Sequence, residues 1–169
     1  MTEQTVSIRP SDEAIDWPET LGRLNALLKI RTTPIGMKMF ATEEEMAAVP
    51  KIRRPKDIHT ADQIVSMASR LNWTVGITGE DLVGTQCQAV LGLGGQDDTW
   101  YSGQHMAGVW FETQEDAAVH QSAMHVVPVG QYQAMAVSPL STGRLAPPDI
   151  CMIYATPGQM IILLSLIHI

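Results

Sequence analysis

The sequence predicts an α+β or irregular α/β domain, in which helices pack on a mixed sheet of about four or more strands. Apolar residues make up 45% of the chain and charged residues 17%, which is typical of a globular protein with a substantial core. Segments with helical periodicity are interspersed with short β-rich segments, but not as regular βαβ units. We expect a flexible tail over residues 1–14 and a single globular domain over residues 15–163.

A leucine-rich helix followed by an alternating strand is expected at the start of the domain. The helix begins near Pro18, and leucines at helical spacing give it one apolar face. Residues 33–34, Thr-Pro, end this helix. Residues 35–40 alternate as a strand does, with apolar side chains on one face and Lys38 on the other. The leucines are Leu21, Leu24, Leu27 and Leu28, and the apolar strand residues are Ile35, Met37 and Met39.

Two capping boxes predict the next helices. Thr42 opens a short helix and Thr60 a longer one, because each is followed three residues later by Glu or Gln. The longer helix runs through Leu71, and a short β-rich segment follows over residues 73–77. We expect this helix to bury Ile64, Ala68 and Leu71.

The second half of the chain predicts one helix and two strands. Residues 87–93 are apolar and fit either a buried helix or a strand. Thr113 caps a helix that runs from residue 114 to about residue 125. Residues 132–137 and 150–155 predict two further strands.

The last six residues are expected to be foreign to the protein. The DNA string CTGTCTCTTATACACATC, which is similar to the mosaic-end adapter that transposase attaches to sequencing libraries, translates to the sequence of residues 164–169, Leu-Ser-Leu-Ile-His-Ile. Residues 156–159, Thr-Pro-Gly-Gln, form a good helix start, yet the apolar run that follows has no polar face. We therefore expect the domain over 15–163 to lack its natural C-terminal part.

Charge and composition exclude several classes of protein. The net charge of −7 argues against general nucleic-acid binding, which requires a basic surface. The apolar run over residues 160–169 is far shorter than the roughly 20 residues that span a bilayer, so no membrane segment is expected. The polar N-terminus has no signal-peptide pattern, and two cysteines are too few for a disulfide framework. These features predict a cytoplasmic protein with free thiols.

The glycines and histidines do not match known cofactor or metal motifs. The glycine cluster over residues 92–95 would need a further glycine where Asp97 stands to fit the dinucleotide fingerprint, so we interpret it as a turn. His120 and His125 diverge around a helix, which disfavours a metal site made only of residues in this chain. No motif indicates a particular cofactor.

Four residues are candidates for a ligand site: Lys38, Glu80, Asp81 and Cys87. Lys38 is either solvated or, if its face of the strand is covered, paired with a ligand carboxylate or with Glu80. Cys87 is either a small core residue or a site thiol, although the carboxylates nearby in sequence disfavour a thiolate. If this site exists, Lys38, Glu80 and Cys87 should border one cleft and lie within about 10–12 Å of one another.

Two other features carry alternative interpretations. The basic run over residues 51–56 is either a solvated loop or an anion-binding patch for a phosphate or carboxylate. Cys151, inside a predicted apolar strand, is expected in the core.

Three segments together resemble the prokaryotic family known as domain of unknown function 169. They are residues 34–39, residues 79–94 with Cys87, and residues 148–160 with the Tyr-Ala-Thr-Pro-Gly-Gln-Met run. The resemblance covers most of residues 15–163 and implies a soluble bacterial or archaeal protein with Cys87 at a family cysteine position. Many relatives carry a Cys-Pro-Gly turn there, whereas Gln88 follows the cysteine here. The resemblance also implies a further cysteine-containing region after the last segment, but no reaction.

The first functional hypothesis is a cytoplasmic protein that binds a small anionic molecule or cofactor through Lys38 and the basic run. An alternative is a thiol, metal or cluster protein that combines Cys87 with a cysteine from the missing region. A third is a non-catalytic accessory protein that acts through a partner. The sequence does not decide whether the protein is an enzyme.

The foreign origin of the tail is directly testable. Sequencing the genomic locus from an adapter-free library should give a different continuation after about residue 163, because an adapter is absent from the genome. Genomic DNA that encodes Leu-Ser-Leu-Ile-His-Ile followed by a stop codon would contradict this expectation.

Overall fold

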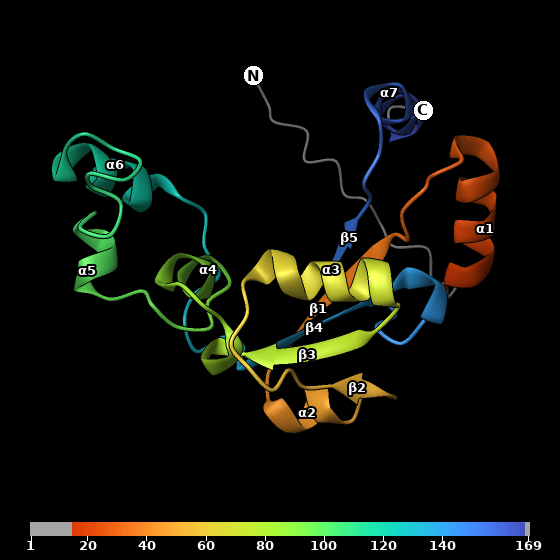
Figure 1. Cartoon of the computed structure of the whole chain (residues 1–169), viewed down its shortest axis with the longest axis horizontal. Coiled ribbons are helices and arrows are strands. Elements are labelled where there is room, and N and C mark those ends of the chain that lie inside the picture. Colours follow the sequence, from red (N-terminus) through yellow and green to blue (C-terminus); the bar gives the residue numbers. More distant parts are fainter. Residues whose placement is uncertain (1–14, 168–169) are drawn as a thin grey trace, which may run out of the picture.

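A five-stranded mixed sheet in the order β2-β3-β4-β1-β5 organises the protein (Figure 1). The computed structural model describes residues 15–167, so the expected tail over 1–14 and residues 168–169 lie outside the described residues. The strands are β1 (Ile35–Phe40), β2 (Ile52–Arg53), β3 (Thr74–Thr78), β4 (Ala134–Pro139) and β5 (Ile150–Met152). β2 pairs with β3 in parallel, and all other pairs are antiparallel. This arrangement confirms the predicted α+β class with a mixed sheet.

Helices cover both faces of the sheet and extend beyond it. The α-helices are α1 (Trp17–Leu28), α2 (Glu43–Ala47), α3 (Ala61–Leu71), α4 (Thr85–Val90), α5 (Asp98–Tyr101), α6 (Gln114–Ala123) and α7 (Pro157–Ile167). Two 3₁₀ turns, η1 (Gly79–Asp81) and η2 (Leu140–Thr142), follow β3 and β4. Figure 1 shows α3 on one face of the sheet and α2 on the other, with α4, α5 and α6 in a lobe to one side. We call residues 85–123 the helical lobe. Helix α7 includes part of the expected adapter segment.

The sheet separates two apolar clusters. On the α3 face, β1, β3 and β4 pack against Ile64 and Ala68. On the α2 face, Met46 packs against Phe40 of β1 and the small side chains of Ala134 and Ala136. The α3-face strand residues are Ile35, Met37, Val75, Ile77, Met135 and Val137. Met39 packs on the same cluster, as the alternation over residues 35–40 predicts.

Local sequence signals account for the helix starts. Both predicted capping boxes form, and the Thr60 backbone N–H donates to Gln63 Oε1 at 3.0 Å. The apolar run over 87–93 resolves into α4 and a turn, and the glycine cluster that follows is also a turn. The short elements β2 and α5 have no counterpart among the sequence predictions.

Leu71 departs from the expected burial. Its side chain is 51% exposed, although its spacing from Ile64 and Ala68 places it near their face of α3. The reason is that the last turn of α3 lies at the end of the sheet, where Asn72 turns the chain into β3 with a left-handed backbone. Periodicity therefore identifies the face of a helix but not where the covering sheet stops.

No helix in the described part of the chain is both long and apolar enough to cross a membrane.

The contrast between two α3 side chains can be measured. Ile64→Ala should lower the free energy of unfolding by about 2–5 kcal/mol, because the fully buried side chain leaves a cavity between α3 and the sheet. Leu71→Ala on the same helix should change it by about 0.5 kcal/mol or less. Chemical denaturation of both variants tests this, and equal losses would show that Leu71 is buried.

Candidate functional site

The strand directions bring separate loops together at each end of the sheet. β1 and β3 both run antiparallel to β4, so they run parallel to each other and their first residues lie at the same end. β5 runs antiparallel to β1 and therefore finishes at that end. We call this the basic end, because Lys29, Arg31 and Arg70 lie there. At the opposite end, which we call the acidic end, β1 and β3 finish near Glu43 and Glu80.

Lys38 has a structural role on the α2 face of β1. Its ammonium Nζ donates a hydrogen bond to the Pro147 carbonyl oxygen at 2.8 Å. It lies between Met37 and Met39, which both pack on the α3 face, so it points to the opposite side. Through the pairing of β1 with β4 and of β4 with β3, Lys38 lies two strand spacings, about 10 Å, from Gly76 of β3.

Glu80 and Asp81 lie in the turn η1 at the acidic end. Asp81 already has partners within the protein. Its Oδ2 accepts from the Thr78 backbone N–H at 2.8 Å and from Arg54 Nη2 at 2.6 Å. Glu80 is exposed and lines an open hollow of about 470 Å³ together with Glu43, which we call the acidic hollow. Two carboxylates in its wall disfavour an anionic ligand.

Helix α4 is fastened against η1 by one amide side chain. Gln88 Nε2 donates to the Gly79 carbonyl oxygen at 2.8 Å and to the Leu82 carbonyl oxygen at 3.1 Å. A Cβ atom at Gly79 would collide with the Leu93 carbonyl oxygen, so the close approach of the glycine-rich turn requires glycine there. The glycines of this segment therefore serve packing and turns.

The two cysteines are free thiols on different elements. Cys87 is partly buried in α4 and does not line any of the hollows described in this section. Cys151 was expected in the core but is exposed, because β5 is an edge strand with Gly36 of β1 as its partner. Partial burial nevertheless raises the pKa of the Cys151 thiol above its ordinary value. Residues 15–167 contain no group of three side chains suited to hold a metal ion.

The structure brings Glu80 and Asp81 together but leaves Lys38 on a different part of the sheet. Within the basic run, Arg53 and Arg54 make internal contacts, whereas Lys51 and Lys56 are exposed. Arg54 bridges Glu43 and Asp81, and the Arg53 guanidinium carbon lies 4.5 Å from the centre of the Trp73 ring. Further cations line the hollows at the basic end.

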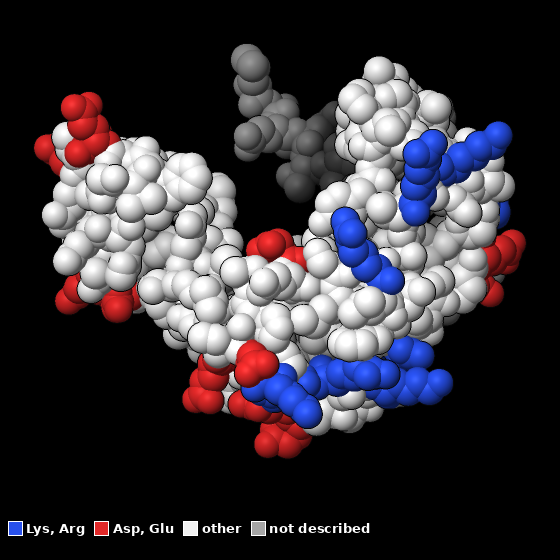
Figure 2. Space-filling model, in the orientation of Figure 1, with Lys and Arg blue, Asp and Glu red and all other residues white. Residues whose placement is uncertain are grey.

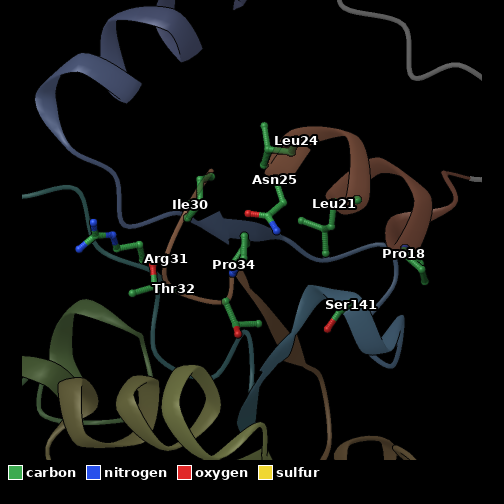
Figure 3. A pocket seen from close by; sticks show the side chains of 11 residues that line it. Pro18, Leu21, Leu24, Asn25, Ile30, Arg31, Thr32, Pro34 and Ser141 are labelled. Carbon is green, nitrogen blue, oxygen red and sulfur yellow. The ribbon is translucent and has the colours of Figure 1, made fainter. Parts of the chain in front are cut away.

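Three hollows surround the loop over residues 29–34 at the basic end. The cationic hollow, of about 550 Å³, is lined by Arg31, Thr32, Thr33, Ser66, Ser69, Arg70 and Tyr154. The second hollow, of about 410 Å³, is called the apolar hollow for its leucine, isoleucine and proline side chains, although Asn25 and Ser141 also line it (Figure 3). It shares Arg31, Thr32 and Thr33 with the cationic hollow. The third hollow, of about 570 Å³, shares Arg31, Thr32 and Tyr154 with the cationic hollow and adds Lys29 and Gln159. The three hollows are therefore neighbours around one loop.

Hydrogen bonds from distant segments hold this loop in place. Gln159 Nε2 donates to the Leu28 carbonyl oxygen at 2.7 Å, while its Oε1 accepts from the Thr156 backbone N–H at 2.7 Å. Thr32 Oγ1 donates to the Tyr154 carbonyl oxygen at 3.3 Å. The predicted helix start over residues 156–159 thus also fixes the end of α1 and the loop that carries Arg31.

Among residues 15–167, those that line these three hollows include cations and hydroxyl groups but no carboxylate. Within the described residues, neither Arg31 nor Arg70 forms an ion pair. The charge separation is visible in the sequence, since residues 71–143 contain no Lys or Arg. Figure 2 shows the helical lobe with acidic side chains only, and basic side chains over the sheet and around α1.

Sequence reasoning missed this region because its parts are distant along the chain. One signal was available: Ser66, Ser69 and Arg70 have the spacing that places them on one side of α3. A second was the loop Arg31-Thr32-Thr33, which joins a cation to two hydroxyls just before a buried strand.

Comparison with known proteins identifies the family. The model of domain of unknown function 169, described as an uncharacterised ArCR family, matches residues 23–169. The chain belongs to this family. No curated protein and no solved structure matches the chain. In this member of the family, the matched region includes both ends of the sheet and both cysteines.

The raised pKa of Cys151 predicts slow alkylation at neutral pH. In a Cys87→Ser variant, the rate of iodoacetamide labelling should reach half its maximum at a higher pH in the folded protein than in denaturant, because only the thiolate reacts. The denatured chain of the same variant is the control. A folded-state profile at or below the denatured one would show that burial does not disfavour the thiolate.

Proposed function

We propose that this protein binds a small anion, a carboxylate or a phosphate, at the basic end of its sheet. The observation that carries the proposal is that Arg31 and Arg70 line one hollow together with hydroxyl side chains, and that no carboxylate of the described residues lines it. An enzymatic role is not part of the proposal.

The chemistry of the cationic hollow supports an oxyanion. Guanidinium groups present donors in a planar fork that matches two oxygens of a carboxylate or phosphate. The hydroxyls of Thr33 and Ser66 can donate further hydrogen bonds to the same oxygens, whereas those of Thr32 and Ser69 already donate to backbone carbonyls. Arg54 is not suited to this role, because its guanidinium group already forms ion pairs with Glu43 and Asp81.

Electrostatics favours this hollow over the acidic one. The chain carries a net charge of −7, so an anion needs a local excess of positive charge to approach. Lys29, Arg31 and Arg70 provide that excess, whereas Glu43 and Glu80 line the acidic hollow. The same net charge supports a ligand other than nucleic acid.

We also propose a cytoplasmic location for the protein. Two free cysteines support it, since thiols persist where the environment is reducing.

Titration with inorganic phosphate and with acetate tests the proposed site. Chemical shifts of amides near Arg31 should move saturably in the wild type. Arg31→Gln and Arg70→Gln should each weaken binding by about tenfold or more, because each removes a charge-assisted hydrogen bond worth about 1.5–3 kcal/mol. Lys56→Gln, which removes one positive charge from an exposed residue of the basic run, should leave the affinity unchanged.

Two results would contradict the proposal. One is equal weakening in all three variants, which would indicate a response to net charge alone. The other is loss of stability without loss of affinity in Arg70→Gln, which would assign Arg70 to compensating the dipole at the end of α3.

A further inference from the structure

We infer that the anion bound at the basic end carries an apolar body, which lies in the apolar hollow between α1 and the start of β1. This inference rests on the proposed function and adds to it the chemical class of the ligand. The ligand is then an amphiphilic carboxylate or phosphate ester with its charged group at Arg31 and Arg70.

The position of the two hollows against one loop is the first argument. The cationic hollow and the apolar hollow are both lined by Arg31, Thr32 and Thr33, so a molecule longer than phosphate could reach from one hollow into the other past this loop. Figure 3 shows Arg31 and Thr32 at one end of the apolar hollow and Pro18 at the other. The Arg31 side chain points away from α1, which leaves the apolar hollow free of charged groups along α1.

The lining of the apolar hollow is the second argument. Leu21 and Leu24 of α1 face Ile30 and Pro34 across it, with Pro18 at its end (Figure 3). Its volume of about 410 Å³ lies within the range of pockets for small organic ligands. Inorganic phosphate or acetate would leave these side chains in contact with water, whereas an apolar body would cover them.

Gly22 offers a way to fill the hollow without disturbing the fold. It lines the apolar hollow, and a Cβ atom at this position meets no heavy atom within 4 Å. It lies inside α1, where residues other than glycine are favoured. Gly22→Phe should therefore fold normally and occupy the space of the ligand body. Ala26→Phe is the matched control, because Ala26 is exposed on the same helix and does not line the hollow.

The experiment compares acetate, butanoate, hexanoate and octanoate by titration of the purified chain. In the wild type and in Ala26→Phe, affinity should rise along the series, by up to about fourfold for each methylene that leaves water. In Gly22→Phe, acetate should bind as in the wild type and the gain along the series should disappear. Octanol, which lacks the charged group, should bind far more weakly than octanoate.

The outcomes separate this inference from the proposed function. If acetate binds through Arg31 but octanoate binds no better, the apolar body is excluded and the anion site stands. If affinity still rises along the series in Gly22→Phe, or if octanol binds as tightly as octanoate, the inference that one ligand occupies both hollows is overturned. If neither acetate nor phosphate binds in the wild type, the proposed function itself fails.

Discussion

The complete burial of β4 is the constraint on which the rest of the structure depends. All residues from Ala134 to Pro139 are buried, with β3 on one side, β1 on the other and a helix on each face. Ala134 and Ala136 are small enough for α2 to approach closely, while Met135 and Val137 fill the α3 side. Because β4 opposes both neighbours, those neighbours share a direction, and the loops before them must meet at one end. The basic end follows from this geometry.

The parts of the fold that the sequence predicted correctly have local causes. The bounds of β1 follow from the alternation of residues 35–40, and the starts of α2, α3 and α7 follow from hydroxyl side chains that cap backbone N–H groups. Leu71 and Cys151 were misplaced for a non-local reason, since each lies where the sheet ends or has an edge. Whether a side chain at the end or edge of a sheet is buried depends on which other segments of the chain cover it.

The candidate site depends even more on contacts between segments that are distant in sequence. Lys38 is a candidate by its position in a strand, and the Pro147 carbonyl to which its Nζ donates comes from a segment distant in sequence. Glu80 and Asp81 are candidates that lie close to Cys87 in sequence, and Arg54, from an earlier segment, forms an ion pair with Asp81. Arg31 and Arg70 meet only because β1 and β3 share a direction, which no single segment reveals. The lack of Lys and Arg over residues 71–143 is visible in the sequence, and it restricts positive side chains to the remaining segments.

Separation of charge between the two ends of the sheet has a consequence for the kinetics of encounter. The helical lobe and the acidic end repel an anion at distances up to about a Debye length, roughly 8 Å at physiological ionic strength, while Lys29, Arg31 and Arg70 attract it. Collisions are thereby biased toward one end of the molecule. Salt screens this long-range field but acts much less on hydrogen bonds already formed. For the proposed anion site, ionic strength would then act mainly on the association rate, and the hydroxyl and guanidinium contacts would set the dissociation rate.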